Sequence, residues 1–230
     1  MLEQLFPASW IERKAWFAFV LGVSYTVMGI GSALLLFPKE PGLAAVAFTS
    51  LLALPSLNKL LTLETEQAAR ERKFDLTDPF RNHKDIFSVY IFLFVGVLLV
   101  FSIFSIILPN IATNEIFAEQ INAIGISGSA IGGGGFKSIF SNNLVVFLFA
   151  LIASFIYGSG AIFIIIWNAS VWGVVFGVIA RDAATITNYN PFTYFILAMI
   201  VIAPHMITEA SGFFLSRPKS LYTSYELEFI

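Results

Sequence analysis

Residues 142–182 read NNLVVFLFALIASFIYGSGAIFIIIWNASVWGVVFGVIARD, and no charged side chain occurs in this stretch before Arg181. A hydrocarbon core of about 30 Å is crossed by roughly 20 helical residues, so the stretch is too long for one crossing. It therefore predicts a helical hairpin, from Asn142 to Asp182, that enters the membrane and returns.

Two places in the hairpin are candidates for its turn. Asn168 follows Trp167, and an Asn side chain can cap the free amides at the start of a new helix. Gly158, Ser159 and Gly160 form the alternative turn, which would divide the stretch into more equal halves. We favour Asn168 and expect the helix to break there.

Small residues occur along both halves of the hairpin. Lipid tails are as apolar as leucine, so membrane helices associate through close backbone packing and interhelical hydrogen bonds. We therefore expect the hairpin to be the centre against which the other helices pack, through Ala150, Ser154, Gly158, Gly160, Gly173 and Gly177.

The composition places the chain among integral membrane proteins. Hydrophobic residues make up 57% and charged residues 12%, where soluble domains have about a quarter charged. The expected fold is all-α, a polytopic transmembrane bundle of about six helices, with a single domain over 1–215 and a tail over 216–230. The absence of cysteine excludes disulfides and thiolate chemistry, and no basic block indicates nucleic-acid binding.

Four further apolar runs are predicted to span. They are Ala15–Phe37, Gly42–Leu61, Ile86–Leu108, which Pro109 stops, and Pro191–Leu215. The second contains Pro55 and is either a kinked span or a re-entrant segment, of which we favour the span.

Basic residues predict the orientation. Cytoplasmic loops carry an excess of Lys and Arg, and Asn110–Ser141 holds only Lys137, so this segment is expected outside. The charged stretch Thr62–Arg81 is expected to continue the second helix into water on the inner side. With six crossings of the plasma membrane, both termini are cytoplasmic, and Met1–Lys14 is either an interfacial helix or a solvated tail. The basic residues of the inner loop are Lys59, Arg70, Arg72, Lys73, Arg81 and Lys84.

The outer segment contains a glycine run, Gly132 to Gly135, but Phe136 precedes Lys137, so the spacing of a phosphate-binding loop fails. We interpret the run as a flexible linker. Apolar residues earlier in this segment are expected to hold part of it on the membrane surface, namely Phe117, Ile121, Ile124 and Ile126.

Two ionisable residues lie in the last apolar run. His205 and Glu209 are four residues apart and therefore share one helix face, at a cost on the order of 2.5 to 3.5 kcal/mol per charge at membrane depth. We expect them to bond to Asn168 and to the backbone freed by a break there. The alternative is a substrate or proton site. Asn142 and Asn143 at the hairpin entrance complete the candidate polar cluster. His205 and Glu209 are its two potential metal ligands, which are too few to hold a metal ion. No cofactor is indicated.

Several short motifs resemble the archaeal branch of the stage II sporulation protein M family. Glu3 and the segment Trp10 to Lys14 are similar to the family's N-terminal motif, and His83-Lys84, Phe117 and Gln120 recur in matching places. Most specific are Asn142-Asn143 and the segments Tyr157 to Ala161 and Trp167 to Ser170. Pro204-His205 with Glu209 is similar to the family's HGxxE motif, although Met206 replaces the usual Gly. The resemblance covers about residues 1–214, and the chain departs from it at Arg217-Pro218-Lys219.

The resemblance implies a multi-pass membrane scaffold. Sporulation members hold peptidoglycan-degrading partners at a septum, and the scaffold role transfers to this chain better than those partners do. We therefore expect a non-enzymatic protein that contacts lipid and other membrane or envelope proteins. Association with further copies of the same chain into a homo-oligomer is left open. The alternative is a small transporter or channel, based on a broken helix at Asn168 with His205 and Glu209. An enzyme acting on lipid is the third hypothesis, for which no nucleophile stands beside a base.

Overall fold

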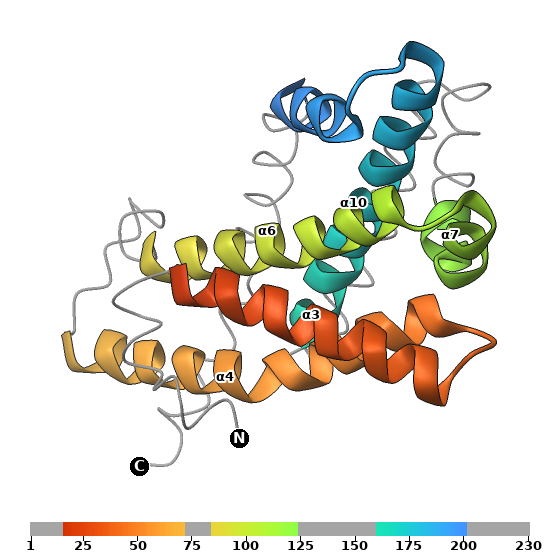
Figure 1. Ribbon diagram of the computed structural model, residues 1–230. Coiled ribbons are helices and arrows are strands. Elements are labelled where there is room, and N and C mark those ends of the chain that lie inside the picture. The colour runs from red at the N-terminus through yellow and green to blue at the C-terminus, as the bar shows by residue number, and fades with distance from the viewer. Residues whose placement is uncertain (1–15, 72–83, 124–159, 202–230) are drawn as a thin grey trace, which may run out of the picture.

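The computed structural model describes residues 16–71, 84–123 and 160–201, and every regular element in these ranges is a helix (Figure 1). The helices are α3 (Trp16–Leu36), α4 (Pro41–Glu71), α6 (Lys84–Ile107), α7 (Asn110–Ile116) and α10 (Gly160–Thr187). Two further helices cover 118–123 and Pro191–Val201. The expected all-α fold is confirmed for this part of the chain.

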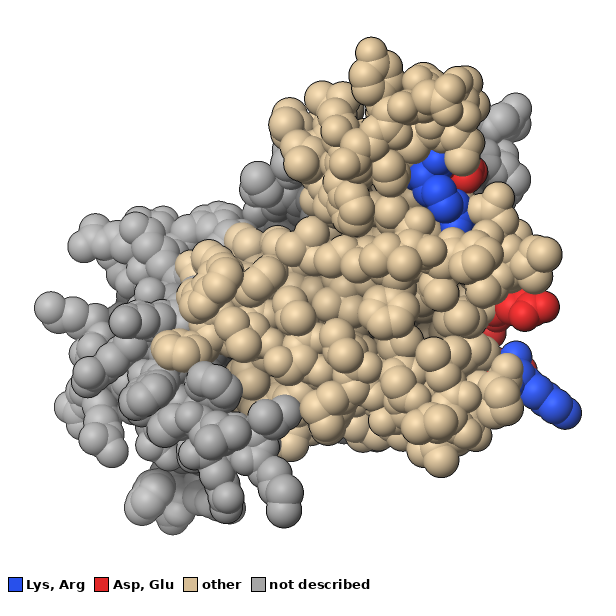
Figure 2. Space-filling view, in the orientation of Figure 1, with Lys and Arg blue, Asp and Glu red and all other residues tan. Residues whose placement is uncertain are grey.

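Three helices are long and apolar enough to cross a membrane: Trp16–Leu36, Ser88–Ile107 and Ile162–Thr187. Pro41–Leu57 and Pro191–Val201 are shorter apolar helices in the described ranges. Large apolar side chains such as Leu35, Ile107 and Val201 are exposed on the outside of the bundle. In Figure 2 the charged side chains drawn in colour lie at one end of the face in view, and the tan surface beside them is uncharged. These features identify a membrane protein, whereas the count of six crossings stays a prediction.

The helix α6 lies between α3 and α10, and α4 packs against α3 and α10 (Figure 1). Glycine lets the backbones of α3 and α6 meet. A Cβ built on Gly22 would lie 2.7 Å from the carbonyl oxygen of Leu93, and one on Gly96 would lie 2.6 Å from that of Phe19. Such distances leave no room for any side chain, so these two helices are in direct backbone contact.

The same kind of contact joins α10 to α6. A Cβ on Gly173 would lie 2.6 Å from the carbonyl oxygen of Leu98, and one on Gly177 would lie 2.7 Å from that of Ser102. The contacts follow the same order along both helices, with Gly173 at Leu98 and Gly177 at Ser102. The helices α6 and α10 therefore run in the same general direction where they meet. The partner of this glycine pair is α6, which the sequence did not identify.

Hydroxyl groups inside the bundle bond to their own helices. Thr26, Thr49, Ser50, Ser102 and Ser105 are buried, and each donates to the carbonyl oxygen four residues earlier, at 2.7 to 2.9 Å. This local bonding satisfies a polar group without a partner on another helix. Small polar residues can therefore line the helix contacts in an apolar surrounding.

The predicted break at Asn168 is wrong, because α10 continues without interruption from Gly160 to Thr187. Asn costs a helix well under about 1 kcal/mol relative to Ala. Opening the ladder inside a membrane would instead leave backbone groups unbonded, at several kcal/mol each. The second cost exceeds the first. The helix begins at Gly160, the last residue of the alternative turn, and the preceding half of the hairpin lies outside the described residues.

Proline is accommodated within α4, which runs through Pro55 for 31 residues. The sequence interpretation favoured a span here, and the structure shows a helix through Pro55, but the apolar part, Pro41–Leu57, is shorter than the three candidate spans, so the crossing stays a prediction. The predicted helical extension into the charged stretch after Thr62 is confirmed as far as Glu71, where the described range ends.

Residues 110–123, the first part of the segment predicted to lie outside, are more ordered than the sequence indicated. They comprise α7 and the helix at 118–123, and Phe117 between them is fully buried, with its ring 5.6 Å from the ring of Phe101. The expectation that Phe117 rests on the membrane surface is therefore wrong, because the ring fills the bundle instead. Ile121 packs partly buried against the same core. Ile124, Ile126 and the glycine run lie outside the described residues.

Candidate functional site

Polar groups from five helices meet at one end of the bundle, which we call the α7 end. It comprises the start of α4, the end of α6, α7 with the helix at 118–123, and the α10 residues Ser170 and Arg181 that contact them (Figure 1). Two groups of contacts, around Arg181 and around Gln120, hold residues 110–123 to α4, α6 and α10.

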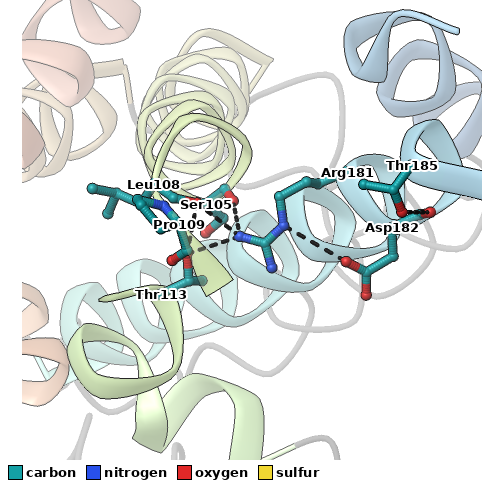
Figure 3. Close-up of polar contacts among 7 residues, drawn as sticks. All are labelled: Ser105, Leu108, Pro109, Thr113, Arg181, Asp182 and Thr185. Atoms are coloured by element: carbon teal, nitrogen blue, oxygen red, sulfur yellow. Dashed lines mark hydrogen bonds and ion pairs between the residues drawn. The ribbon is translucent and has the colours of Figure 1, made fainter. Parts of the chain in front are cut away.

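Arg181 on α10 reaches the last turn of α6 (Figure 3). Its Nη1 donates to the carbonyl oxygens of Ser105 at 3.0 Å and Leu108 at 2.9 Å. The residue that would bond to Ser105 in a continuing helix is Pro109, which has no N–H. A positive side chain at a helix C-terminus is also favoured by the helix dipole. Arg181 therefore completes the end of α6.

The same Nη1 donates to the hydroxyl oxygen of Thr113 on α7 at 2.9 Å. Thr113 is fully buried, and its hydroxyl donates in turn to the carbonyl oxygen of Pro109 at 3.2 Å. An Nη group carries two hydrogens, so one of them is shared among these three acceptors. Arg181 thereby ties α10, α6 and α7 together at one point.

Asp182 is the acidic neighbour of this guanidinium. Its Oδ1 lies 3.6 Å from Arg181 Nε, and the two side chains are 57% and 13% exposed respectively. An ion pair with one partner in solvent contributes little to stability. The hydrogen bonds to Ser105, Leu108 and Thr113 therefore dominate the placement of Arg181.

Gln120 forms the second group of contacts. It has no exposed surface, and its Nε2 donates to the carbonyl oxygen of Gly42 at 3.1 Å and lies 3.5 Å from the hydroxyl of Ser170. Ser170 donates to the carbonyl oxygen of Trp167 at 2.7 Å. Gln120 thus links residues 110–123 to the start of α4 and to α10. Its Oε1 is buried and has no hydrogen-bond partner among the described residues.

Asn168 is the one member of the predicted polar cluster whose side chain the structure describes. It is half-buried on the unbroken α10, and its Nδ2 is buried without a hydrogen-bond partner in the part of the chain that the structure describes. Asn142, Asn143, His205 and Glu209 lie outside the described residues, so the predicted pairing with Asn168 stays a prediction. Of the packing residues, Gly173 and Gly177 lie at the contact with α6, Gly160 begins α10, and Ala150, Ser154 and Gly158 lie outside the described part.

The sequence interpretation missed the roles of Arg181 and Thr113, and it noted Gln120 only for its resemblance. One signal was present. A spacing of four residues places Gly173, Gly177 and Arg181 on one helix face. If the glycines pack against a neighbouring helix, Arg181 lies where it can bond to the end of that helix. The burial of Thr113 and Gln120 had no comparable signal in a polar connecting segment.

The described residues contain no group of three or more His, Cys, Asp or Glu side chains positioned to hold a metal ion. Comparison of the chain with protein-family models, with curated proteins and with solved structures gives no match in any of the three. The family resemblance therefore stays a prediction, and the function rests on the geometry of the α7 end.

Proposed function

We propose that the protein is a non-enzymatic membrane scaffold that presents the outer segment to partner proteins. The observation that carries this proposal is that residues 110–123 are bonded on their inner side to α4 and α10, through Gln120 and Thr113, and that the same Arg181 which bonds to Thr113 also bonds to the end of α6. A connecting segment that needed only to join two spans would not require buried polar bonds to each of them.

The other side of α7 is free to bind. Thr113 and Phe117 are buried on the inner side, whereas Asn110, Ile111 and Asn114 are exposed, with Ile111 at 75%. A short helix fixed on one side and exposed on the other presents side chains in constant geometry. Preorganised side chains bind a partner without the entropy cost of ordering them.

The transport alternative has lost one of its two features, the broken helix, while His205 and Glu209 lie outside the described residues. Discontinuous helices mark binding sites in many transporters, and α10 is continuous. Backbone contacts at Gly22, Gly96, Gly173 and Gly177 also close the space between α6 and its two neighbours. These contacts favour a static bundle over one with a path between these helices.

The proposed orientation places the α7 end outside the plasma membrane, with both termini in the cytoplasm. Six basic residues between Ser56 and Asp85, against one in Asn110–Ser141, support this orientation. Partners would then be other membrane or envelope proteins. The resemblance to the stage II sporulation protein M family agrees with such a role but names no partner for this chain.

The test is quantitative co-purification of the tagged, full-length protein from its native membrane. Asn114→Arg changes the exposed side of α7, and Thr193→Arg makes a similar change at an exposed position on another helix. We expect defined membrane proteins to co-purify with the wild type and with Thr193→Arg and to be lost with Asn114→Arg. Equal recovery with both variants, or solute flux through liposomes containing the wild type, would argue against the scaffold.

A further inference from the structure

Proline interrupts the backbone hydrogen bonding of α4 at Pro55. Its nitrogen carries no hydrogen to donate to the carbonyl oxygen of Leu51, four positions earlier, and its ring crowds that oxygen. Both residues are exposed, Leu51 at 63%, so the gap lies on the outward side of the helix. A helix that is opened on one side bends toward the other, which for α4 is the side of the bundle.

The part of α4 before Pro55 is packed tightly. A Cβ built on Gly29 of α3 would lie 2.9 Å from the carbonyl oxygen of Ala45 and 3.1 Å from the amide nitrogen of Thr49, so the two backbones are in close contact. Gln120 Nε2 donates to the carbonyl oxygen of Gly42 at 3.1 Å. This part of α4 is therefore fixed to α3 and to the α7 end.

The packing changes just after Pro55. The hydroxyl oxygens of Tyr25 on α3 and Ser56 on α4 lie 3.0 Å apart, and both residues are buried. A small cavity of about 10 Å³ lies beside them among α3, α4 and α6, and Ala53, Ser56 and Leu57 form its α4 side. Atoms that face a cavity lose dispersion contacts. The hydrogen bond between Tyr25 and Ser56 therefore has a larger share in holding α4 at this level than any single contact has before Pro55.

Beyond Leu57 the helix continues to Glu71, and in Figure 1 it extends past the first turns of α3 and α6. A long helix beyond a bend converts a small change of angle into a large displacement. Ala69 is 14 positions beyond Pro55, which is about 21 Å at 1.5 Å per residue. A change of about 20° at Pro55 would move it by about 7 Å.

We propose that α4 is a hinged helix, in which Pro55 is the hinge and the hydrogen bond between Tyr25 and Ser56 sets the angle of residues 58–71 relative to the bundle. When that bond breaks, Ser56 can donate to a carbonyl oxygen of its own helix, as Ser50 does to Val46. The Tyr25 hydroxyl loses this contact, which favours the bonded position.

The hinge gives residues 58–71 two positions while the α7 end stays fixed. In the proposed orientation these residues lie in the cytoplasm, so the hinge moves a cytoplasmic helix without disturbing the outer face. This conformational role goes beyond the scaffold function and does not depend on it.

The test measures distances between pairs of nitroxide labels by pulsed electron paramagnetic resonance, on the full-length protein in lipid nanodiscs. The chain has no cysteine, so labels attach only where cysteine is introduced. The reference label is placed at Ile107 on α6 or at Leu35 on α3, both of which are exposed. The second label is placed at Ala69, beyond the hinge, or at Leu51, before it. Two reference positions detect displacements in directions that one distance would miss.

Tyr25→Phe and Ser56→Ala remove the same hydrogen bond from its two ends. In both variants we expect the Ala69 distances to shift or broaden by several ångströms, on the scale of the displacement of about 7 Å given above, and the Leu51 distances to stay as in the wild type. Ser50→Ala is the matched control. It removes a buried hydroxyl of α4 that donates to the Val46 carbonyl oxygen at 2.7 Å, so it should leave both sets of distances unchanged.

Pro55→Ala restores the missing N–H and closes the hinge, so its Ala69 distances should be the same with and without Tyr25→Phe. Ala69 distances that match the wild type in either Tyr25→Phe or Ser56→Ala would overturn the proposal. Equal changes at Leu51 and Ala69 would overturn it too, because the whole helix would then be displaced. A full response to Tyr25→Phe in the Pro55→Ala background would show that the bend does not lie at Pro55.

Discussion

Arg181 Nη1 lies 3.0 Å from the carbonyl oxygen of Ser105, the acceptor on α6 that Pro109 leaves without a helical partner. A single side chain on α10 therefore completes the end of a neighbouring helix and, through Thr113, fixes the helix that follows it. Residues 110–123 depend on this arrangement for their position.

Replacing Arg181 by Leu should lower the free energy of unfolding by about 1.5 to 3 kcal/mol, because part-buried hydrogen bonds from a charged donor to three acceptors are lost. Arg181→Lys should cost less, since an ammonium keeps the charge but cannot reproduce the planar geometry. Denaturant titration in detergent measures both. Asp182→Asn is the control and should stay within about 1 kcal/mol of wild type, and a larger loss there would show that the ion pair holds Arg181.

Thr113 should be coupled to Arg181. Thr113→Val keeps the shape of the side chain and removes the hydroxyl, which should cost about 1 to 2 kcal/mol. In the double variant with Arg181→Leu, the loss should be smaller than the two single losses combined, because both changes break one network. Additive losses, measured in the same titration, would mean that the two residues act independently.

Gly173→Ala should destabilise the protein by about 1 to 3 kcal/mol, since the added methyl would meet the backbone of Leu98 and force α6 and α10 apart. Gly31→Ala is the matched control. Gly31 is an exposed glycine on α3 with open space around it, and the change should be neutral or raise stability by about 0.5 to 1 kcal/mol. Thermal unfolding in detergent compares the two, and equal effects would contradict the close contact of the helices.

Asn168 tests the predicted pairing with the last apolar run. Its Nδ2 is buried without a partner among the described residues, and the sequence predicts His205 and Glu209 as acceptors. Asn168→Leu should then cost about 1 to 3 kcal/mol, and its effect should be non-additive with Glu209→Gln. If Asn168→Leu leaves stability unchanged or raises it, the amide has no partner and the pairing is wrong.

Long apolar runs with clear ends were predictable from the sequence. Ala15–Phe37 and Ile86–Leu108 were expected as spans, and the helices run over Trp16–Leu36 and Lys84–Ile107. Each run is followed by a proline, Pro38 or Pro109, which has no N–H to continue a helix. Length, apolar character and a strong stop determine such elements locally, so the sequence is sufficient for them.

The parts that failed depend on competition between distant effects. Asn168 is a good capping residue, but the cost of unbonded backbone in a membrane outweighs that preference, and the helix continues. Thr113 and Gln120 lie in a polar connecting segment, where such residues are usually solvated. Their burial follows from contacts with Arg181 and Gly42, which are 68 and 78 positions away along the chain. Local pattern carries no information on contacts of that kind.

The central claim is that residues 110–123 form a fixed platform on the transmembrane helices. Amide hydrogen exchange of the full-length protein in lipid nanodiscs tests it most directly, at the amides of Phe117 and Ile121, which bond to Thr113 and Phe117 respectively. We predict exchange nearly as slow as that of α6 in the wild type, and faster exchange of this segment alone in Arg181→Leu. Exchange in the wild type at the rate of an unstructured peptide would contradict both the contacts of Arg181 and the platform.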